Sequence, residues 1–223
     1  MSQTLRLAVF DVDGTLVDSQ HHIHAAMEMT FAGQALDSPS LSAVRSIIGL
    51  SLPQAMRRLI SGLADEEYDA LVEGYKACFK TKRMAGEFAP LYTGISEMLD
   101  ELALDEHLLL GVATGKSRRG LDAVLDGHGM AERFVTAQVA DNHPSKPHPS
   151  MLLAALSETG VEAENAVIIG DTTYDMEMGV AAGMRCIGVL WGYHMVDDLR
   201  AAGAENIVDD AAELQALLNG FWG

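Results

Sequence analysis

Residues 5–15 read LRLAVFDVDGT, an apolar run from Leu5 to Phe10 that is followed at once by Asp11 and Asp13. A short apolar run bounded by polar or glycine residues is typical of a strand buried on both faces. The opening stretch is therefore predicted to be a buried strand with a polar end. Similar runs recur at residues 107–113, 134–139, 166–169 and 185–190.

Stretches with a helical pattern lie between the later runs, at residues 117–125, 149–159 and 174–182. Alternation of strand and helix predicts an α/β fold with a parallel, Rossmann-like sheet. Between Ser19 and Gly86 only amphipathic helix patterns occur, which predicts an all-helical insertion. We therefore expect a catalytic core made of residues 1–18 and 87–223 and a helical cap made of residues 19–86. The expected linkers lie near Asp18 and at residues 88–92.

The composition narrows the classes of function. The 223 residues include 32 acidic and 15 basic side chains, for a formal net charge of -17, and no basic patch is evident, which disfavours a nucleic-acid or anionic-membrane partner. Cys78 and Cys186 are far apart and form no CxxC pair, so neither a disulfide framework nor a zinc knuckle is expected. No signal segment or membrane-length apolar run is found, and the expected location is the cytoplasm. The sequence leaves the oligomeric state open.

Polar side chains follow four of the predicted strands. Ligands of open parallel sheets bind at the carboxyl ends of the strands, so these side chains are candidate site residues. Asp and Gly also end strands for purely structural reasons, but DVDGT and GDTTYD each bring two acids to one loop. The candidates are Asp11, Asp13, Gly14 and Thr15, then Thr114, Gly115 and Lys116, then Lys146, and finally Gly170, Asp171 and Asp175.

The clustered acids predict a cation and a reaction. Like charges gathered in one cleft repel, and aspartate oxygens suit Mg²⁺, which binds few carboxylates together with substrate phosphate oxygens. An ionised aspartate such as Asp11 is already a nucleophile at neutral pH. A phosphoryl group held by Mg²⁺, Lys146 and the Thr114 hydroxyl is a suitable electrophile. If the chain turns after the strand, Asp13 is placed to protonate the leaving group and then to activate water.

Four segments resemble the ordered motifs of the haloacid dehalogenase superfamily, in its phosphoglycolate phosphatase-like branch. They are DVDGTLVDS at 11–19, VATGKS at 112–117, SKPHPSM at 145–151 and GDTTYDMEMG at 170–179. The resemblance implies that Asp11 forms an aspartyl-phosphate and that Asp13 is the acid and base. It also implies phosphate binding by Thr114, Gly115 and Lys146, and Mg²⁺ binding by Asp11, the Asp13 carbonyl, Asp171 and Asp175, the last directly or close by.

The second aspartate also distinguishes between branches. Dehalogenases and phosphonate hydrolases of this superfamily lack an acid two residues after the nucleophile, so Asp13 favours phosphate esters. The resemblance thus implies a Mg²⁺-dependent phosphatase of a small phosphorylated metabolite, with 2-phosphoglycolate as the leading substrate and residues 49–51 of the cap facing it. The alternatives are a sugar-phosphate mutase of the same family and a receiver-like phospho-Asp signalling module, which needs no cap. GVATGKS is one residue short of a nucleotide-binding P-loop.

Three other groups have both a structural and a functional interpretation. The histidines at 21, 22 and 24 open the first cap helix, where they are either solvated or in contact with a metal or substrate. Arg57 and Arg58 form either a charged helix face or a contact with an anion. Residues 191–194 follow the last predicted strand and either pack or form part of the rim of the site.

Overall fold

The computed structural model describes residues 4–84, 86 and 88–221. The strands in this part of the chain are β1 Arg6–Phe10, β2 Leu108–Thr114, β3 Thr136–Val139, β4 Ala166–Gly170, β5 Arg185–Val189 and β6 Asn206–Val208. The α-helices are α1 Gln20–Gly33, α2 Leu41–Arg45, α3 Leu52–Leu59, α4 Asp65–Met84, α5 Ile95–Leu102, α6 Arg118–Gly127, α7 Ser150–Thr159, α8 Thr173–Ala182, α9 Val196–Ala201 and α10 Ala211–Gly220. Two short 3₁₀ helices are η1 Ala131–Arg133 and η2 Ala163–Asn165.

The strands form one parallel sheet in the order β3-β2-β1-β4-β5-β6. The predicted α/β class with a parallel, Rossmann-like sheet is therefore confirmed. Strand β6 was not predicted, because three residues at an edge of the sheet carry too short an apolar run to be distinguished from a loop.

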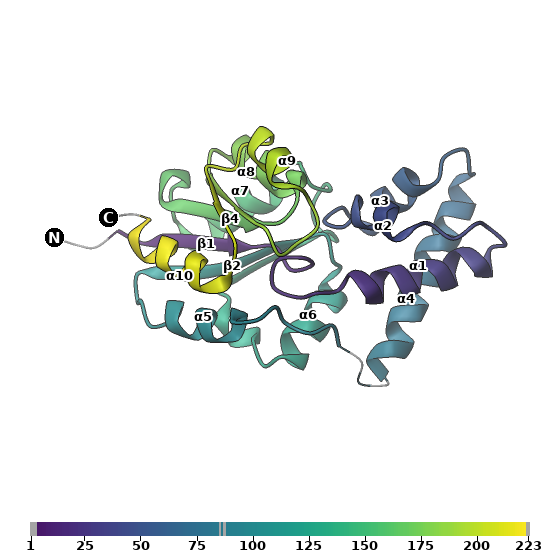
Figure 1. The fold of residues 1–223 in the computed structure, drawn as a ribbon, viewed down its shortest axis with the longest axis horizontal. Coiled ribbons are helices and arrows are strands. Elements are labelled where there is room, and N and C mark those ends of the chain that lie inside the picture. Colours follow the sequence, from purple (N-terminus) through teal and green to yellow (C-terminus); the bar gives the residue numbers. More distant parts are fainter. Residues whose placement is uncertain (1–3, 85, 87, 222–223) are drawn as a thin grey trace.

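Each face of the sheet is covered by helices, because the buried strand residues alternate between two apolar clusters. Phe10 and Val112 belong to the cluster packed by α5, α6 and α10, while Leu7 and Val9 belong to the one packed by α7, α8 and α9. Figure 1 shows the resulting layers of helix, sheet and helix. Burial on both faces explains why the strands read as continuous apolar runs in the sequence.

Helices α1–α4 pack around a third apolar cluster, beyond the carboxyl ends of the strands (Figure 1). The two connections to this bundle run side by side: Val17 and Leu91 form an isolated antiparallel bridge, and the Asp18 amide donates to the Pro90 carbonyl over 2.9 Å. The division into core and cap at these connections stays a prediction. Its boundary residue 87, and residues 1–3 and 222–223 at the ends of the chain, lie outside the described residues.

The helical patterns locate the helices better than their ends. Amphipathic patterns at residues 25–31 and 52–63 predict two helices of the insertion. The corresponding helix α1 begins earlier, at Gln20, and α3 ends earlier, at Leu59. Helix α2 has five residues, too few to show an amphipathic period, and it was not predicted. Neither was α5, although four of its eight residues are buried against the sheet.

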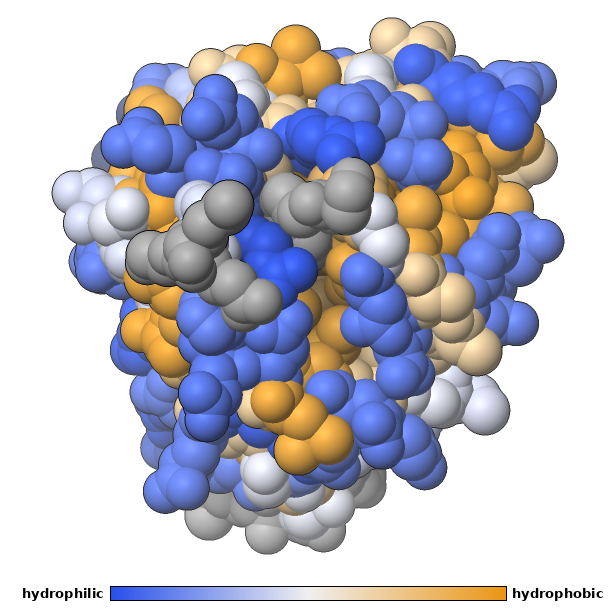
Figure 2. Space-filling view, turned by 90° about the vertical axis from the view of Figure 1, so that its left-hand side faces the viewer, coloured by the Kyte–Doolittle hydropathy of each residue, from blue (hydrophilic) through white to orange (hydrophobic). Residues whose placement is uncertain are grey.

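Figure 2 shows the end of the molecule that lies opposite helices α1–α4. Hydrophilic side chains cover most of this face, with apolar side chains scattered among them (Figure 2). Within the described ranges, no helix is both long and apolar enough to cross a bilayer.

Candidate active site

The candidate site lies where the chain changes direction across the sheet. From β1 the chain passes to β2 and β3 on one side and then crosses to β4, which is the other neighbour of β1. Such a switch point opens a crevice at the carboxyl ends of the two central strands. Asp11 directly follows β1, Asp171 directly follows β4, and Thr114 ends the adjacent β2.

Lys146 is the buried cation of this crevice. Its Nζ lies 2.7 Å from Asp11 Oδ1 and 2.6 Å from Asp175 Oδ1, and the three side chains are at most 1% exposed. Burial lowers the pKa of the ammonium, but the two carboxylates outweigh it and the net shift is upward. Lys146 therefore carries a positive charge at neutral pH, and it links the loop before α7 to the end of β1 and the first turn of α8.

Asp175 holds Lys146 in place. It is the third residue of α8, and its Oδ2 accepts hydrogen bonds from the backbone amide and the hydroxyl of Thr172, over 3.1 and 2.6 Å. This reciprocal arrangement with the N-cap residue is a capping box, which stabilises the start of a helix. Both Asp175 oxygens are thus engaged, one by the cap of α8 and the other by the lysine.

Asp171 is held by groups from two other loops. Its Oδ1 accepts from the Thr15 hydroxyl over 2.9 Å, and its Oδ2 accepts from the Tyr193 amide over 3.0 Å. The loop after β1 approaches so closely that a Cβ on Gly14 would lie 2.2 Å from Asp171 Oδ2, and Gly14 has a φ of 89°. Position 14 therefore requires glycine. Burial, followed by the charges of Asp175 and Asp11, raises the pKa of Asp171 well above its ordinary value.

Asp11 has one carboxylate oxygen beside the lysine and one that is left over. Its Oδ1 lies beside Lys146, while its buried Oδ2 has no hydrogen-bond partner among the described residues. Burial raises the pKa of Asp11 to about 7, with Asp175 and Asp13 adding to the shift and Lys146 opposing it. A buried carboxylate with an unpartnered oxygen is costly unless a ligand completes its surroundings.

Three of the predicted metal ligands lie close together. Asp11, Asp171 and Asp175 each place one carboxylate oxygen within 4.8 Å of the other two, and all three are buried. An all-oxygen donor set, together with the orphaned Asp11 Oδ2, fits a hard divalent cation such as Mg²⁺. The Asp13 side chain is not part of this group, and metal binding by its carbonyl oxygen stays a prediction.

Asp13 has a cationic partner of its own. Lys116 Nζ lies 2.9 Å from Asp13 Oδ2, and the buried Asp13 Oδ1 has no hydrogen-bond partner in the part of the chain that the structure describes. The ammonium also lies 5.9 Å from the centroid of the Phe79 ring on α4, so this pair faces the helical bundle. The sequence placed Lys116 at the end of the second strand but gave it no role. Its position could have indicated a role, because a cation two residues after Thr114 lies at the carboxyl edge of the sheet, close to the acids that follow the first strand.

The two remaining candidates lie beside this pair. The Thr114 hydroxyl, at the end of β2, accepts from the Lys116 amide over 3.2 Å. Gly115 lies against the helical bundle, since a Cβ there would be 2.4 Å from the Leu50 carbonyl oxygen. Gly115 therefore allows the loop before α3 to approach β2.

Several of the ambiguous groups make structural contacts. A His24 ring nitrogen lies 3.1 Å from the Pro39 carbonyl, Arg57 pairs with Asp65 over 2.8 Å, and the Trp191 indole donates to the Thr15 carbonyl over 2.9 Å. These contacts favour the structural interpretation of the three side chains. Arg58 instead lines a cavity between the bundle and the sheet.

The chain resembles known proteins over nearly its whole length. Residues 8–189 match the family model described as haloacid dehalogenase-like hydrolase. Among curated proteins, "Probable phosphatase IndB" of Dickeya dadantii is 36% identical over 93% of this chain and 91% of its own, and a phosphoglycolate phosphatase of Pseudomonas putida is 30% identical over 96% and 79%. A crystal structure of a predicted phosphatase from Clostridium acetobutylicum superposes with a TM-score of 0.87 at 25% identity, covering 98% of this chain and 100% of its own. The chain thus belongs to the haloacid dehalogenase-like hydrolase family, which confirms the resemblance found in its motifs.

Proposed function

We propose that this enzyme is a Mg²⁺-dependent phosphatase that hydrolyses a small phosphomonoester through an aspartyl-phosphate, with 2-phosphoglycolate as the leading substrate. The observation that carries the proposal is the state of Asp11, a buried carboxylate held beside Lys146 with one oxygen free. The names of the relatives from D. dadantii and P. putida support phosphatase activity, and the second of them supports the substrate.

In the first step an Asp11 oxygen attacks phosphorus, and the bond from phosphorus to the ester oxygen breaks. The leaving alkoxide takes a proton from Asp13, which must then be protonated when the substrate binds. Lys146 remains beside Asp11 and compensates the negative charge that gathers on the phosphoryl oxygens. The Thr114 hydroxyl, at the neighbouring strand end, would donate to one of these oxygens.

In the second step water attacks the phosphorus of the aspartyl-phosphate while Asp13 accepts the proton from that water. This releases inorganic phosphate and regenerates the Asp11 carboxylate. Lys116 Nζ, 2.9 Å from Asp13 Oδ2, orients the carboxylate that would serve as the base. Asp13 thus alternates between the two protonation states that the two steps require.

The metal would be held by Asp11 and Asp171, with the Asp13 carbonyl and Asp175 as the further proposed ligands. When bound, Mg²⁺ would neutralise the clustered carboxylates and the phosphoryl oxygens, so that one anion can approach another. Asp171 is already oriented for this role by its bonds from Thr15 and Tyr193.

Helices α1–α4, within the proposed cap of residues 19–86, would select the leaving group. The Phe79 ring of α4 lies near the Lys116 ammonium, which pairs with Asp13. The proposed acid and base, Asp13, therefore lies on the side of the site that faces the bundle. Groups bonded to the ester oxygen would therefore contact the bundle, while the phosphoryl group contacts the strand ends. The cytoplasmic location expected from the sequence stays a prediction.

The test is release of inorganic phosphate from a panel of small phosphomonoesters, which includes 2-phosphoglycolate, 3-phosphoglycerate, glycerol phosphate and glucose 6-phosphate. Each is assayed with Mg²⁺ and with excess chelator, and the Asp11→Asn variant is the control for contaminating phosphatases. We expect release only with Mg²⁺ and with the highest kcat/KM for 2-phosphoglycolate. Full activity in chelator would overturn the metal proposal. Interconversion of sugar phosphates without release of phosphate would instead indicate the mutase.

A further inference from the structure

Residues 46–51, which join α2 to α3 and are called the junction loop below, touch the sheet half at three points. The Tyr174 hydroxyl donates to the Ser46 carbonyl over 2.7 Å, and the Ser51 amide donates to the Ser145 hydroxyl oxygen over 2.8 Å. The third point is the close approach of Gly115 to the Leu50 carbonyl described above.

The three residues that contact the junction loop have the same relation to the candidate site. Each of them follows a different strand at the carboxyl edge of the sheet: Gly115 follows β2, Ser145 follows β3, and Tyr174, in the first turn of α8, follows β4. Each is also the immediate neighbour of a candidate site residue. Contacts that hold the loop are therefore tied, through single peptide units, to the groups that would bind the phosphoryl group and the metal. The pairs are Gly115 with Thr114, Ser145 with Lys146, and Tyr174 with Asp175.

Tyr174 is the contact that belongs to both halves. Its backbone lies in α8, on the sheet, but the residue is only 9% exposed and belongs to the apolar cluster of α1–α4. The ring therefore packs in the bundle, while the hydroxyl holds the junction loop to α8 through the Ser46 carbonyl.

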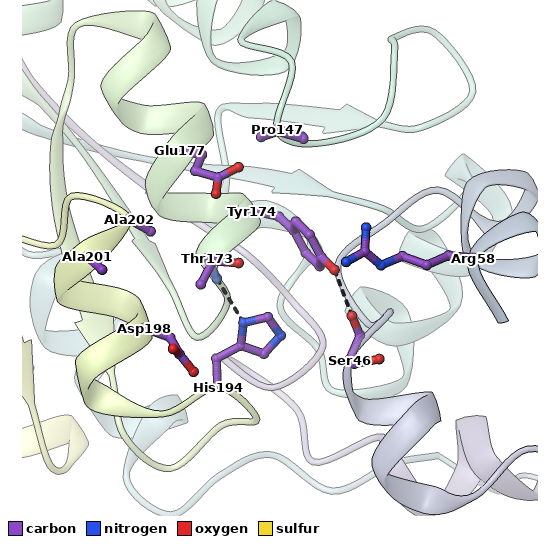
Figure 3. Close-up of a pocket in the computed structure, with 10 residues that line it drawn as sticks. All are labelled: Ser46, Arg58, Pro147, Thr173, Tyr174, Glu177, His194, Asp198, Ala201 and Ala202. Atoms are coloured by element: carbon purple, nitrogen blue, oxygen red, sulfur yellow. Dashed lines mark hydrogen bonds between the residues drawn. The ribbon is translucent and has the colours of Figure 1, made fainter.

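The surroundings of this hydrogen bond are not tightly packed. A cavity of about 680 Å³ opens beside it, lined from the bundle by Ser46 and Arg58 and from the sheet half by Thr173, Glu177 and His194 (Figure 3). In Figure 3 Arg58 reaches from α3 toward the Tyr174 ring, and the dashed line joins the hydroxyl to Ser46. Because side chains do not fill this side of the junction, directed hydrogen bonds contribute a larger share of the contact here than in a close-packed interface.

We propose that Tyr174 is a positioning residue for the reaction: its hydroxyl latches the junction loop over the strand ends and so stabilises the substrate-bound, closed arrangement of the bundle. The proposal rests on the proposed phosphatase function for its kinetic consequence only. The residue touches no reacting atom, so it sets how tightly the site closes on a substrate and leaves the chemical steps unchanged.

The test compares Tyr174→Phe with Tyr68→Phe. Both variants lose a hydroxyl that donates to a backbone carbonyl over a similar distance, but Tyr68 donates over 2.8 Å to Ile60, within the bundle. Losing one hydrogen bond shifts an equilibrium by roughly three- to tenfold. We expect Tyr174→Phe to raise KM by about this factor with kcat unchanged or higher, since the closed form still predominates at saturation. Tyr68→Phe should leave KM unchanged.

A second measurement does not depend on turnover. Hydrogen exchange of a peptide that spans the junction loop, followed by mass spectrometry, should quicken in Tyr174→Phe and not in Tyr68→Phe. Ser145→Ala removes the acceptor of the Ser51 amide and should quicken exchange of the same peptide. Equal exchange of the loop in wild type and Tyr174→Phe would overturn the latch, and so would an unchanged KM in an active variant. If the wild type hydrolysed no phosphomonoester, the proposed function would be wrong. Hydrogen exchange of the junction loop in wild type and Tyr174→Phe would still show whether the Tyr174 hydroxyl holds the loop.

Discussion

Two regions of the molecule are held by different kinds of contact. One is the floor of the site, made of Lys146, Asp171 and Asp175, and the other is the junction, where residues 46–51 of the bundle meet the strand ends. On the floor, Lys146, Asp175 and Asp171 are fully buried and are held by six polar contacts among the segments after β1, before α7, after β4 and after β5. At the junction, two hydrogen bonds and one close backbone approach hold a loop beside a cavity. We therefore expect substitutions to be more costly on the floor than at the junction, and we expect the junction to open more readily.

The difference separates two tasks of a hydrolase. A phosphoryl group is the same in every phosphomonoester, so a fixed floor serves all substrates. Leaving groups differ, and a loop that opens and closes must admit them and then exclude water. Substitutions in the floor should therefore affect the chemical steps and stability together, while substitutions at the junction should affect affinity.

The largest expected effect is that of Asp11→Asn. The amide is nearly isosteric but cannot attack phosphorus, so kcat should fall by at least about 10⁴-fold for every substrate. Steady-state phosphate release measures the loss, and mass spectrometry of the intact protein checks that the asparagine has not deamidated. Retention of more than a trace of activity in an intact variant would remove Asp11 from the nucleophile position.

Lys146→Met should combine a kinetic and a structural loss. The rate should fall about 10²–10³-fold because the charge on the phosphoryl oxygens is no longer compensated. The variant should also lose about 3–5 kcal/mol of stability, because Asp11 and Asp175 are left buried and unpaired. Denaturant unfolding measures this loss in the free energy of unfolding, with Lys76→Met as the control.

In the control, Lys76 pairs with Glu73 over a similar 2.7 Å, but both side chains are more than half exposed. Its loss should fall within about 1 kcal/mol. Equal stability losses in the two lysine variants would show that the floor is no more tightly held than the surface.

Asp13→Asn should lower turnover of an alkyl phosphate by about 10²-fold or more, since the leaving alkoxide receives no proton. An aryl phosphate with an activated leaving group needs no proton, so Asp11 should still be phosphorylated while its hydrolysis slows. Mass spectrometry after rapid quenching should then find a phosphoryl group on the peptide that contains Asp11. Rapid turnover of both substrates by this variant would remove Asp13 from the acid–base role.

The smallest expected effect concerns the stability of the metal-free protein. The raised pKa of Asp11, about 7, means that the folded protein holds this proton at pH values where the unfolded chain has lost it. Stability should therefore fall as the pH rises from about 4 to 7, and remain low above that range. Thermal unfolding in excess chelator should show a decrease of several degrees between pH 5 and 8, at about 2–4 °C per kcal/mol.

The Asp11→Asn variant is the matched control for this pH dependence. It should show a smaller decrease, and at pH 8 added Mg²⁺ should stabilise it less than it stabilises the wild type. The same pH dependence in both proteins would contradict the upward shift of the Asp11 pKa.

The sequence predicted the parts of the site that depend on the strand ends. Asp11, Lys146 and Asp171 follow buried apolar runs, and a parallel sheet necessarily brings such positions to one edge. Contacts that depend on the tertiary path of loops could not be predicted. Nothing local indicates that Tyr174 inserts its ring among α1–α4, or that Lys116 turns toward Asp13, because these contacts join segments more than 100 residues apart.

The paired connections at Val17 and Leu91 also have a consequence for how such enzymes diversify. Because the chain leaves and re-enters the sheet half at adjacent positions, the intervening helices can lengthen, shorten or be exchanged without moving the ends of β1 or α5. If this segment selects the leaving group, as proposed above, new substrate preferences can arise in it while the strand ends are inherited unchanged. A change of substrate would then require substitutions only between Val17 and Leu91, two positions that lie side by side in the fold.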